Sequence, residues 1–244
     1  MINENFVKNW IPKKKNSDEI EISKKKKSDE DEYDSILKKI QEQDSYIDWK
    51  TFERIYNWKA SRSKNYLDTK NKELYISAFK EISDLDDVEK INFFKQTKQR
   101  KKLPGILEPI ASTILHFKYP DKFPIMDVRT VGTLRDKGLL KAKKISYENY
   151  RAEIFKIYDN CKKEFSLREI DKALFTYNEQ KELLLRVLEG KKSLTDVAKH
   201  LKIPQERKME LILDLENKYK ESLVKLNNLK NELSSLPLNE SQKS

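Results

Sequence analysis

Apolar residues recur at helical spacing along most of this sequence from residue 33 onward, and no other feature limits its possible folds as strongly. The clearest case is the segment 103–115, whose apolar positions are Leu103, Ile106, Leu107, Ile110, Ala111, Ile114 and Leu115. Steps of three and four residues place side chains along one side of a helix. The segment therefore predicts a buried helical face.

The same spacing recurs around residues 36–40, 49–59, 74–82 and 88–94, while strand-like alternation is scarce. Of the four glycines, Gly138 and Gly190 stand where a helix would end. A chain of 244 residues is long enough for one main domain with appendages. We therefore expect an all-α fold.

Charge is distributed unevenly between the first 34 residues and the rest of the chain. Residues 1–34 hold eight lysines and nine acidic residues and few apolar ones, a composition typical of a flexible charged lead. The lead therefore has a net charge of −1 and, since the total is +10, the remaining residues carry about +11. A basic folded part favours a polyanionic partner such as nucleic acid.

Cysteine and hydropathy exclude several classes of protein. One cysteine, Cys161, cannot form an intramolecular disulfide or a four-thiolate metal site. No apolar run approaches the roughly 18 residues of a membrane span, and the start MINENFVKNW lacks an apolar signal core. We expect a cytoplasmic protein without membrane contact, metal or other cofactor.

A proline-glycine turn precedes the most regular helical stripe. Proline fixes φ and glycine accepts positive φ, so Pro104–Gly105 allows a sharp turn between two short helices, and Pro109 suits the first turn of the second helix. Residues 95–102 (KQTKQRKK), directly before the turn, contribute five positive charges and no negative ones. Exposed backbone N–H groups beside such charge could hold a phosphate.

Asp127 follows the loop YPDKFP and precedes VRTVGTL, where Val128, Val131 and Leu134 resume helical spacing. Its simplest role is that of a helix N-cap. A carboxylate in this position can also serve chemistry, and the two roles are compatible.

Taken together, the stretch LPGILEPIASTILHFKYPDKFPIMDVRT (103–130) resembles the helix-hairpin-helix motif of the endonuclease III-like superfamily of DNA glycosylases. The segments WKASR (58–62), ASTILHFKYPDKFPIMD (111–127) and SLREIDKALFTY (166–177) together resemble a small, mostly uncharacterised prokaryotic branch of that superfamily. The resemblance covers about residues 45–180. It implies a two-lobed helical fold over residues 35–180, followed by a C-terminal helical extension.

The resemblance implies an activity and assigns residues to it. Asp127 matches the catalytic aspartate, which would assist release of a base from an extruded nucleotide in DNA, most simply in a duplex. The turn and its neighbours would bind the DNA backbone; these residues are Arg100, Lys101, Lys102, Leu103, Pro104, Gly105, Ile106, Leu107 and Arg129.

The sequence departs from the family pattern at two hairpin positions. Pro109 stands where bifunctional members carry a Schiff-base lysine, so we expect base removal by water without lyase activity. Leu107 replaces a second hairpin glycine, so phosphate binding at the turn would be weaker or shifted to residues 100–102. The iron–sulfur cluster of some relatives cannot form, because its four cysteines are missing.

Several other residues allow both a functional and a structural role. Trp58, Lys59, Arg62 and Tyr177 could line a base pocket, with core aromatics and surface cations as the alternative; Phe175 has the same ambiguity. His116 on the apolar stripe favours a structural role. Arg129, Arg135 and the basic run 135–144 could contact a DNA strand or simply be solvated.

The C-terminal region, residues 181–234, predicts further helices. Residues 183–204 resemble the first half of a helix-turn-helix, although helices that dock on a core or partner explain the pattern better. Residues 205–233 predict one long amphipathic helix. That helix could pair with a partner protein or a second copy of the chain. Residues 235–244 should be disordered.

Three functions remain open on the sequence. A glycosylase could act in base-excision repair or in defence against phage DNA that carries modified bases. A non-catalytic DNA-binding module or regulator would use the same basic surfaces without needing Asp127.

Overall fold

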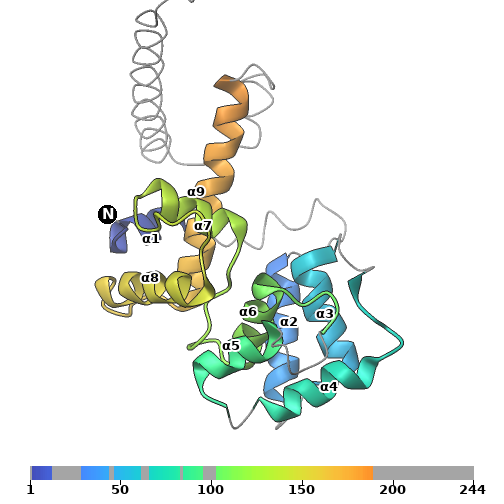
Figure 1. The fold of residues 1–244 in the computed structure, drawn as a ribbon. Coiled ribbons are helices and arrows are strands. Elements are labelled where there is room, and N and C mark those ends of the chain that lie inside the picture. The colour runs from blue at the N-terminus through green and yellow to red at the C-terminus, as the bar shows by residue number, and fades with distance from the viewer. Residues whose placement is uncertain are drawn as a thin grey trace, which may run out of the picture. The chain divides into compact units, whose positions relative to one another are not determined.

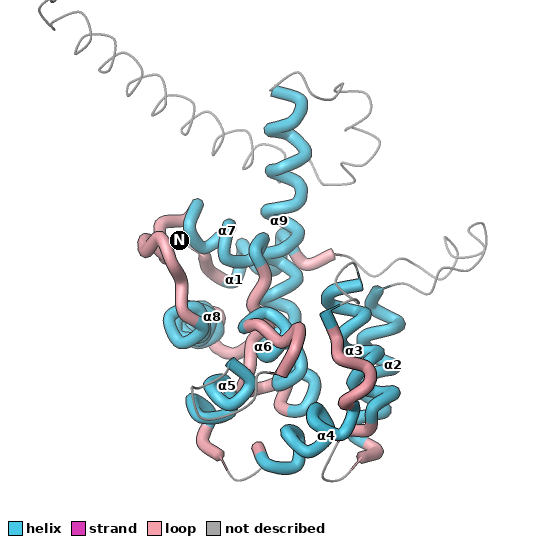
Figure 2. Tube along the Cα trace, turned by 45° about the vertical axis from the view of Figure 1, so that its right-hand side comes forward, coloured by secondary structure: helices cyan, strands magenta, loops and turns pink. Residues whose placement is uncertain are grey.

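Helices make up most of the described part of the chain. The computed structural model describes residues 2–12, 29–43, 47–61, 66–82, 85–95 and 103–188. Helices and connecting loops, with no strand, make up these ranges (Figure 2). The expected all-α class is therefore confirmed for this part. The chain divides into two compact units, residues 1–179 and 180–244.

Nine helices lie within the described residues. In chain order they are α1 (Glu4–Trp10), α2 (Asp29–Gln41), α3 (Trp49–Ala60), α4 (Lys72–Glu81), α5 (Asp87–Lys95), α6 (Glu108–Lys118), α7 (Val128–Asp136), α8 (Tyr147–Asn160) and α9 (Leu167–Leu188). The periodic segments of the sequence correspond to α2, α3, α4, α5 and α6. The sequence analysis did not identify α8.

Helix α6 is the central helix of the first unit. It packs against α2, α3 and α5, and α3 in turn packs against α2 and α4 (Figure 1). Every residue from 111 to 117 is buried, so α6 is enclosed on all sides rather than on one stripe. The expected buried face is confirmed at Leu103, Ile106 and Ile110 as well.

Leu107 is a correction to that stripe. Its side chain is 66% exposed, and the residue is the N-cap of α6 in extended backbone. The turn at Pro104–Gly105 interrupts the helix, so the spacing that predicted burial no longer holds across it. Pro109 lies in the first turn of α6, as expected.

The N-terminal lead is a second correction. Residues 4–10 form α1, whose Phe6, Val7 and Trp10 are buried. The Trp10 ring meets the Tyr177 ring of α9 edge-on, with centroids 5.1 Å apart. Helix α2 also begins within the expected lead, at Asp29. Residues 13–28 of the expected lead lie outside the described residues.

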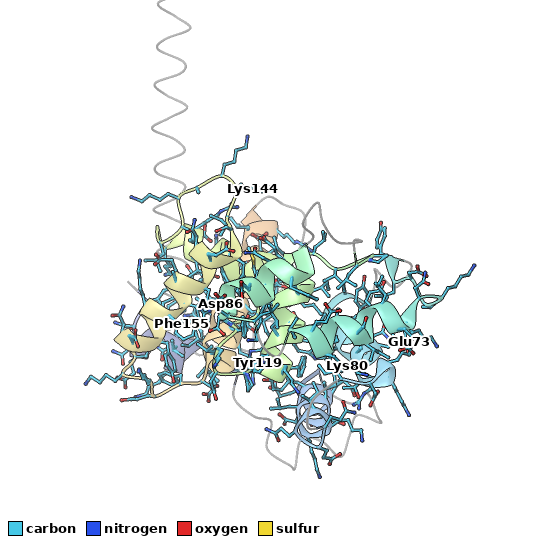
Figure 3. The ribbon with its side chains drawn as sticks, turned by 60° about the horizontal axis from the view of Figure 1, so that its bottom comes forward. Glu73, Lys80, Asp86, Tyr119, Lys144 and Phe155 are labelled. Carbon is cyan, nitrogen blue, oxygen red and sulfur yellow. The ribbon has the colours of Figure 1, made fainter. Side chains whose placement is uncertain are left out.

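Helix ends follow the chemistry of their residues. Gly138 has a φ of +73°, and its N–H donates to the Arg135 carbonyl after the last turn of α7, so it ends the helix as expected. Arg151 of α8 pairs with Asp87 at the start of α5, 2.9 Å away, and its guanidinium lies over Phe155. Phe155 and Asp86, the neighbour of Asp87, are labelled in Figure 3.

Some expectations fall outside the described residues. These are the ending at Gly190, the helix-turn-helix-like segment beyond residue 188, the helix over 205–233 and the tail 235–244. None of the described helices combines the length and apolar character needed to cross a bilayer.

Candidate functional site

The segment that leads into Asp127 is held in place by buried side chains. Residues 123–127 belong to no helix or strand, and each has a backbone group bonded to a side chain. The bonds are His116 Nδ1 to Phe123 O (2.8 Å), Tyr147 Oη to Pro124 O (3.0 Å), Tyr150 Oη to Ile125 O (2.6 Å), Met126 N to Ser112 Oγ (3.0 Å) and Asp127 N to Thr130 Oγ1 (3.1 Å). The position of Asp127 is thus determined by α6, α7 and α8 together.

His116 has the structural role that its place on the stripe favoured. The ring is buried, and since Nδ1 donates to the Phe123 carbonyl, the neutral ring accepts from the Tyr33 hydroxyl at Nε2, 2.7 Å away. Burial lowers the pKa of His116 to about 4, which keeps the ring neutral. His116 therefore holds the loop in place, and both of its ring nitrogens are hydrogen-bonded.

Asp127 caps helix α7, as the sequence predicted. Its Oδ1 accepts from the Arg129 N–H at 2.9 Å, and Thr130 completes a capping box by accepting from the Asp127 N–H. Thr130 Oγ1 also lies 3.1 Å from the Tyr150 hydroxyl oxygen. One oxygen of the carboxylate is therefore hydrogen-bonded to the backbone at the start of α7.

The other oxygen of Asp127 meets Lys59. Lys59 Nζ on α3 lies 2.7 Å from Oδ2, with side-chain exposures of 11% for Lys59 and 23% for Asp127. Burial acts to raise the pKa of Asp127, but the Lys59 ammonium and the Arg129 N–H outweigh it and leave the pKa below its usual value. The result is an ionised carboxylate that is fixed in position and still partly open to solvent.

The proline-glycine turn is packed against two other segments. Gly105 has a φ of +77°, and a Cβ there would lie 2.9 Å from the Tyr66 carbonyl oxygen and 3.1 Å from the Tyr56 hydroxyl. Tyr75 Oη donates to the Pro104 carbonyl at 2.9 Å. The glycine is therefore required both by its backbone conformation and by this close approach.

Helix α3 joins the turn to the carboxylate. Tyr56 approaches Gly105, and Lys59, three residues later on the same helix, bonds to Asp127. Side chains three positions apart on a helix are neighbours. The two features that the sequence analysis singled out separately thus both contact α3, and neither the Tyr56 approach nor the Lys59 bond could be assigned from spacing.

A buried acid lies close enough to influence the pair electrostatically. Asp171 on α9 is buried and its Oδ2 accepts from Arg168 at 2.5 Å, while Oδ1 has no hydrogen-bond partner. Burial raises the pKa of Asp171, which is also affected by the charges of Arg168, Lys59 and Asp127. Arg168 lies over the rings of Tyr33 and Trp58.

Two base-pocket candidates differ in their burial. Trp58 is half-buried and packs edge-on against Phe117 and under the Arg168 guanidinium, so it stays a candidate. Tyr177 is fully buried between Trp10 and Phe6, with the Lys137 ammonium 4.5 Å from its ring. Lys137 follows the last residue of α7, whereas Asp127 precedes the first, so Tyr177 is corrected to a core residue distant from the carboxylate.

The residues expected to bind DNA differ in their surroundings. Arg129 is half exposed, lies over the Phe175 ring at 4.6 Å and faces Glu179 at 3.8 Å, so its charge is partly balanced. Arg62, Arg100, Lys101 and Lys102 lie outside the described residues. Leu103 and Ile106 are buried, and Pro104 is half-buried.

The basic run 135–144 forms the connection between α7 and α8. Arg135 donates to the carbonyls of Ala142 and Lys143 and so closes this connection on itself. Residues 141–144 are exposed, and Figure 3 shows Lys144 extending away from the helices. The run therefore presents lysines to solvent, which both sequence interpretations allow.

Among the described residues, no three His, Cys, Asp or Glu side chains are grouped so that they could hold a metal ion. Comparison of the chain with protein-family models, with curated proteins and with solved structures finds no match in any of the three. The functional conclusion therefore depends on the geometry of this site and on the motif resemblance.

Proposed function

We propose that this protein is a DNA glycosylase that hydrolyses the N-glycosidic bond of a damaged or modified base and leaves an abasic site. The proposal includes the two-lobed helix-hairpin-helix fold of the endonuclease III-like superfamily with a C-terminal helical extension. Its main support is that α3 contacts both the Pro104–Gly105 turn, through Tyr56, and the ionised carboxylate of Asp127, through Lys59.

In the proposed reaction, the target nucleotide is rotated out of the duplex so that its sugar approaches Asp127. As the bond between C1′ and the base nitrogen breaks, its electron pair leaves with the base and positive charge develops on the sugar. The Asp127 carboxylate stabilises that charge, and water supplies the hydroxyl group at C1′ and the proton taken up by the base.

Lys59 and the hairpin support hydrolysis rather than a covalent mechanism. Lys59 donates a hydrogen bond to Asp127, and an ammonium in that state has no free lone pair for attack on the sugar. Pro109, at the lysine position of bifunctional relatives, has no amine. We therefore propose that Lys59 orients Asp127 and that no Schiff base forms.

The test uses Asp127→Asn on duplex oligonucleotides that carry a panel of modified bases, followed by hot alkali to cleave abasic sites. Asparagine is as good a helix N-cap as aspartate, so the variant should still fold. Its rate of base release should fall by about 100-fold or more. DNA affinity, measured by fluorescence anisotropy, should change little. Borohydride should trap no covalent complex with the wild-type protein.

Asp48→Asn is the matched control, because Asp48 caps the opposite end of α3 by the same bond to a backbone N–H. It should leave base release intact. Full activity of Asp127→Asn would refute the assignment. DNA that is bound but never cleaved by the wild-type protein across the panel would favour the non-catalytic DNA-binding module.

The role in the cell follows from which substrate is cleaved. Release of oxidised, alkylated or deaminated bases would indicate base-excision repair, and release confined to bulky phage-type bases would indicate defence.

A further inference from the structure

Asp171 on α9 is a buried carboxyl group that the packing of its helix does not explain. Its side chain is only 6% exposed, and its Oδ2 accepts from Arg168 Nη1 at 2.5 Å. Its Oδ1 has no hydrogen-bond partner within the described residues. A buried carboxylate with an unsatisfied oxygen destabilises a fold, and an apolar side chain of similar size would fill the same place without that cost. The presence of a charge here therefore requires a reason other than packing.

Arg168 links Asp171 to helix α3. Its guanidinium lies over the Trp58 ring, 5.1 Å from the centroid, and Trp58 directly precedes Lys59 on α3. The contacts that fix Arg168 thus hold Asp171 close to the segment of α3 from which Lys59 reaches Asp127. Burial raises the pKa of Asp171, the charges of Arg168 and Lys59 lower it, and that of Asp127 raises it. Asp171 therefore interacts electrostatically with both members of the Lys59–Asp127 pair.

Tyr150 of α8 gives a second measure of where Asp171 lies. Its hydroxyl group donates to the Ile125 carbonyl at 2.6 Å and lies 3.1 Å from Thr130 Oγ1, so it belongs to the loop and cap that hold Asp127. Burial raises the pKa of Tyr150 well above its usual value, and the charges of Asp171 and Asp127 raise it further. Both carboxyl groups therefore act on one buried hydroxyl group directly behind the loop.

The ion pair of Lys59 with Asp127 has a consequence for the proposed reaction. Because the two charges cancel, the pair alone carries no net charge toward a sugar that becomes positive. A second carboxylate near the lysine makes the sum of the three groups, Asp127, Lys59 and Asp171, negative. Positive charge that develops on the sugar is stabilised by such a site and much less by a neutral pair.

Arg168 does not cancel this effect, because a second carboxylate competes for it. Its Nη2 lies 3.7 Å from Glu30 Oε2 of α2, and Lys172 Nζ lies 3.1 Å from the same oxygen. The positive charge of Arg168 is therefore shared between Glu30 and Asp171. Asp171 is neutralised only in part, and its unpaired oxygen keeps negative charge inside the protein.

We propose that Asp171 is a positioning residue that acts through Lys59: its carboxylate offsets the positive charge of the lysine, so that the negative charge of Asp127 remains effective toward the sugar. The inference rests on the proposed glycosylase function. Asp171 itself is enclosed, and Asp127 remains the group that meets the sugar.

The experiment compares Asp171→Asn, Asp171→Glu and the wild-type protein. Asp171→Asn removes the charge at nearly constant volume and should reduce the single-turnover rate of base release by about tenfold or more. It should also lower the pKa of Asp127 in a ¹³C NMR titration, because Lys59 is then opposed by one carboxylate fewer. Asp171→Glu keeps the charge and should retain both the rate and the pKa. A merely structural role would change stability without changing the Asp127 titration.

Asp87→Asn is the matched control, since it removes the carboxylate of another aspartate–arginine pair, with Arg151 at 2.9 Å, and should change neither readout. Because Asp171→Asn deprives Arg168 of a partner, the wild-type protein provides a second test that needs no variant. As the pH falls, protonation of Asp171 should appear as a second inflection in the titration curve of Asp127.

A single inflection, an Asp127 pKa that is the same in Asp171→Asn and the wild-type protein, or a loss of base release that Asp171→Glu shares would overturn the role of Asp171 alone. A wild-type protein that shows the coupled titration but releases no base from any substrate would overturn the glycosylase proposal instead.

Discussion

At the scale of single residues, Asp127 keeps its charge because Lys59 opposes the effect of burial. Removing that cation in Lys59→Met should raise the pKa of Asp127 above its wild-type value, since burial then acts with less opposition. The measurement is a ¹³C NMR titration of the Asp127 carboxyl group, which does not depend on any activity. In the wild-type protein the group should titrate below the ordinary aspartate pKa of 3.8.

Lys59→Arg is the matched control for this titration, because it retains a cation and should keep the pKa of Asp127 low. The lowered pKa also sets the sign of the stability effect. Asp127 stabilises the folded state above its unfolded pKa, and this contribution is lost as the pH falls through the folded pKa. Identical Asp127 titrations in Lys59→Met and the wild-type protein would show that the ion pair is absent in solution.

Sequence reasoning found Asp127 because an N-cap aspartate before a periodic segment is a local pattern. Its partner Lys59 is 68 residues away in the sequence. Lys59 was predicted as a base-pocket residue, whereas the structure bonds it to the carboxylate. Only the packing of α3 against α6 brings the two together, and no spacing rule encodes that contact.

At the scale of elements, variants of the hairpin turn can separate two reasons for its glycine. One is the positive φ, and the other is the close approach of a neighbouring segment. Gly105→Ala should destabilise the protein by about 1–3 kcal/mol more than the strain of a left-handed alanine alone, because the new methyl group would meet the Tyr66 carbonyl. Urea denaturation of both proteins gives the difference in unfolding free energy. Under the proposed function, DNA affinity should fall as well.

Gly138→Ala provides the comparison, since Gly138 has nearly the same positive φ, +73°, but nothing within 4 Å of an added Cβ. Gly138→Ala should lower the free energy of unfolding by only about 1 kcal/mol. Equal losses in the two variants would mean that the Tyr66 segment does not press on the turn.

The elements themselves were largely predictable, while the loop before Asp127 was not. Periodic apolar residues identify α6, and Gly138 identifies the end of α7, because both signals are local. The loop residues 123–127 depend on Tyr147 and Tyr150 of α8, a helix whose pattern did not stand out in the sequence. Tertiary hydrogen bonds, not local propensity, determine the shape of that loop.

At the scale of the whole molecule, the two ends of the first unit meet at Tyr177. Charge blocks in residues 1–34 predicted a flexible lead, yet α1 buries Trp10 against this side chain. The average composition of these 34 residues conceals three apolar side chains of α1. Burying them stabilises the packed helix by more than the surrounding charges destabilise it. The same contact explains why Tyr177, expected near a base pocket, is a core residue.

Trp10→Ala should therefore destabilise the protein by about 3–5 kcal/mol, the usual loss when a buried tryptophan is truncated. Lys8→Ala, on the exposed side of the same helix, should leave the unfolding free energy almost unchanged. Urea denaturation followed by tyrosine and tryptophan fluorescence measures both variants. If Trp10→Ala unfolded at the same urea concentration as the wild-type protein, α1 would be separable from the core, and a chain beginning near residue 29 should then retain the Lys59–Asp127 site unchanged.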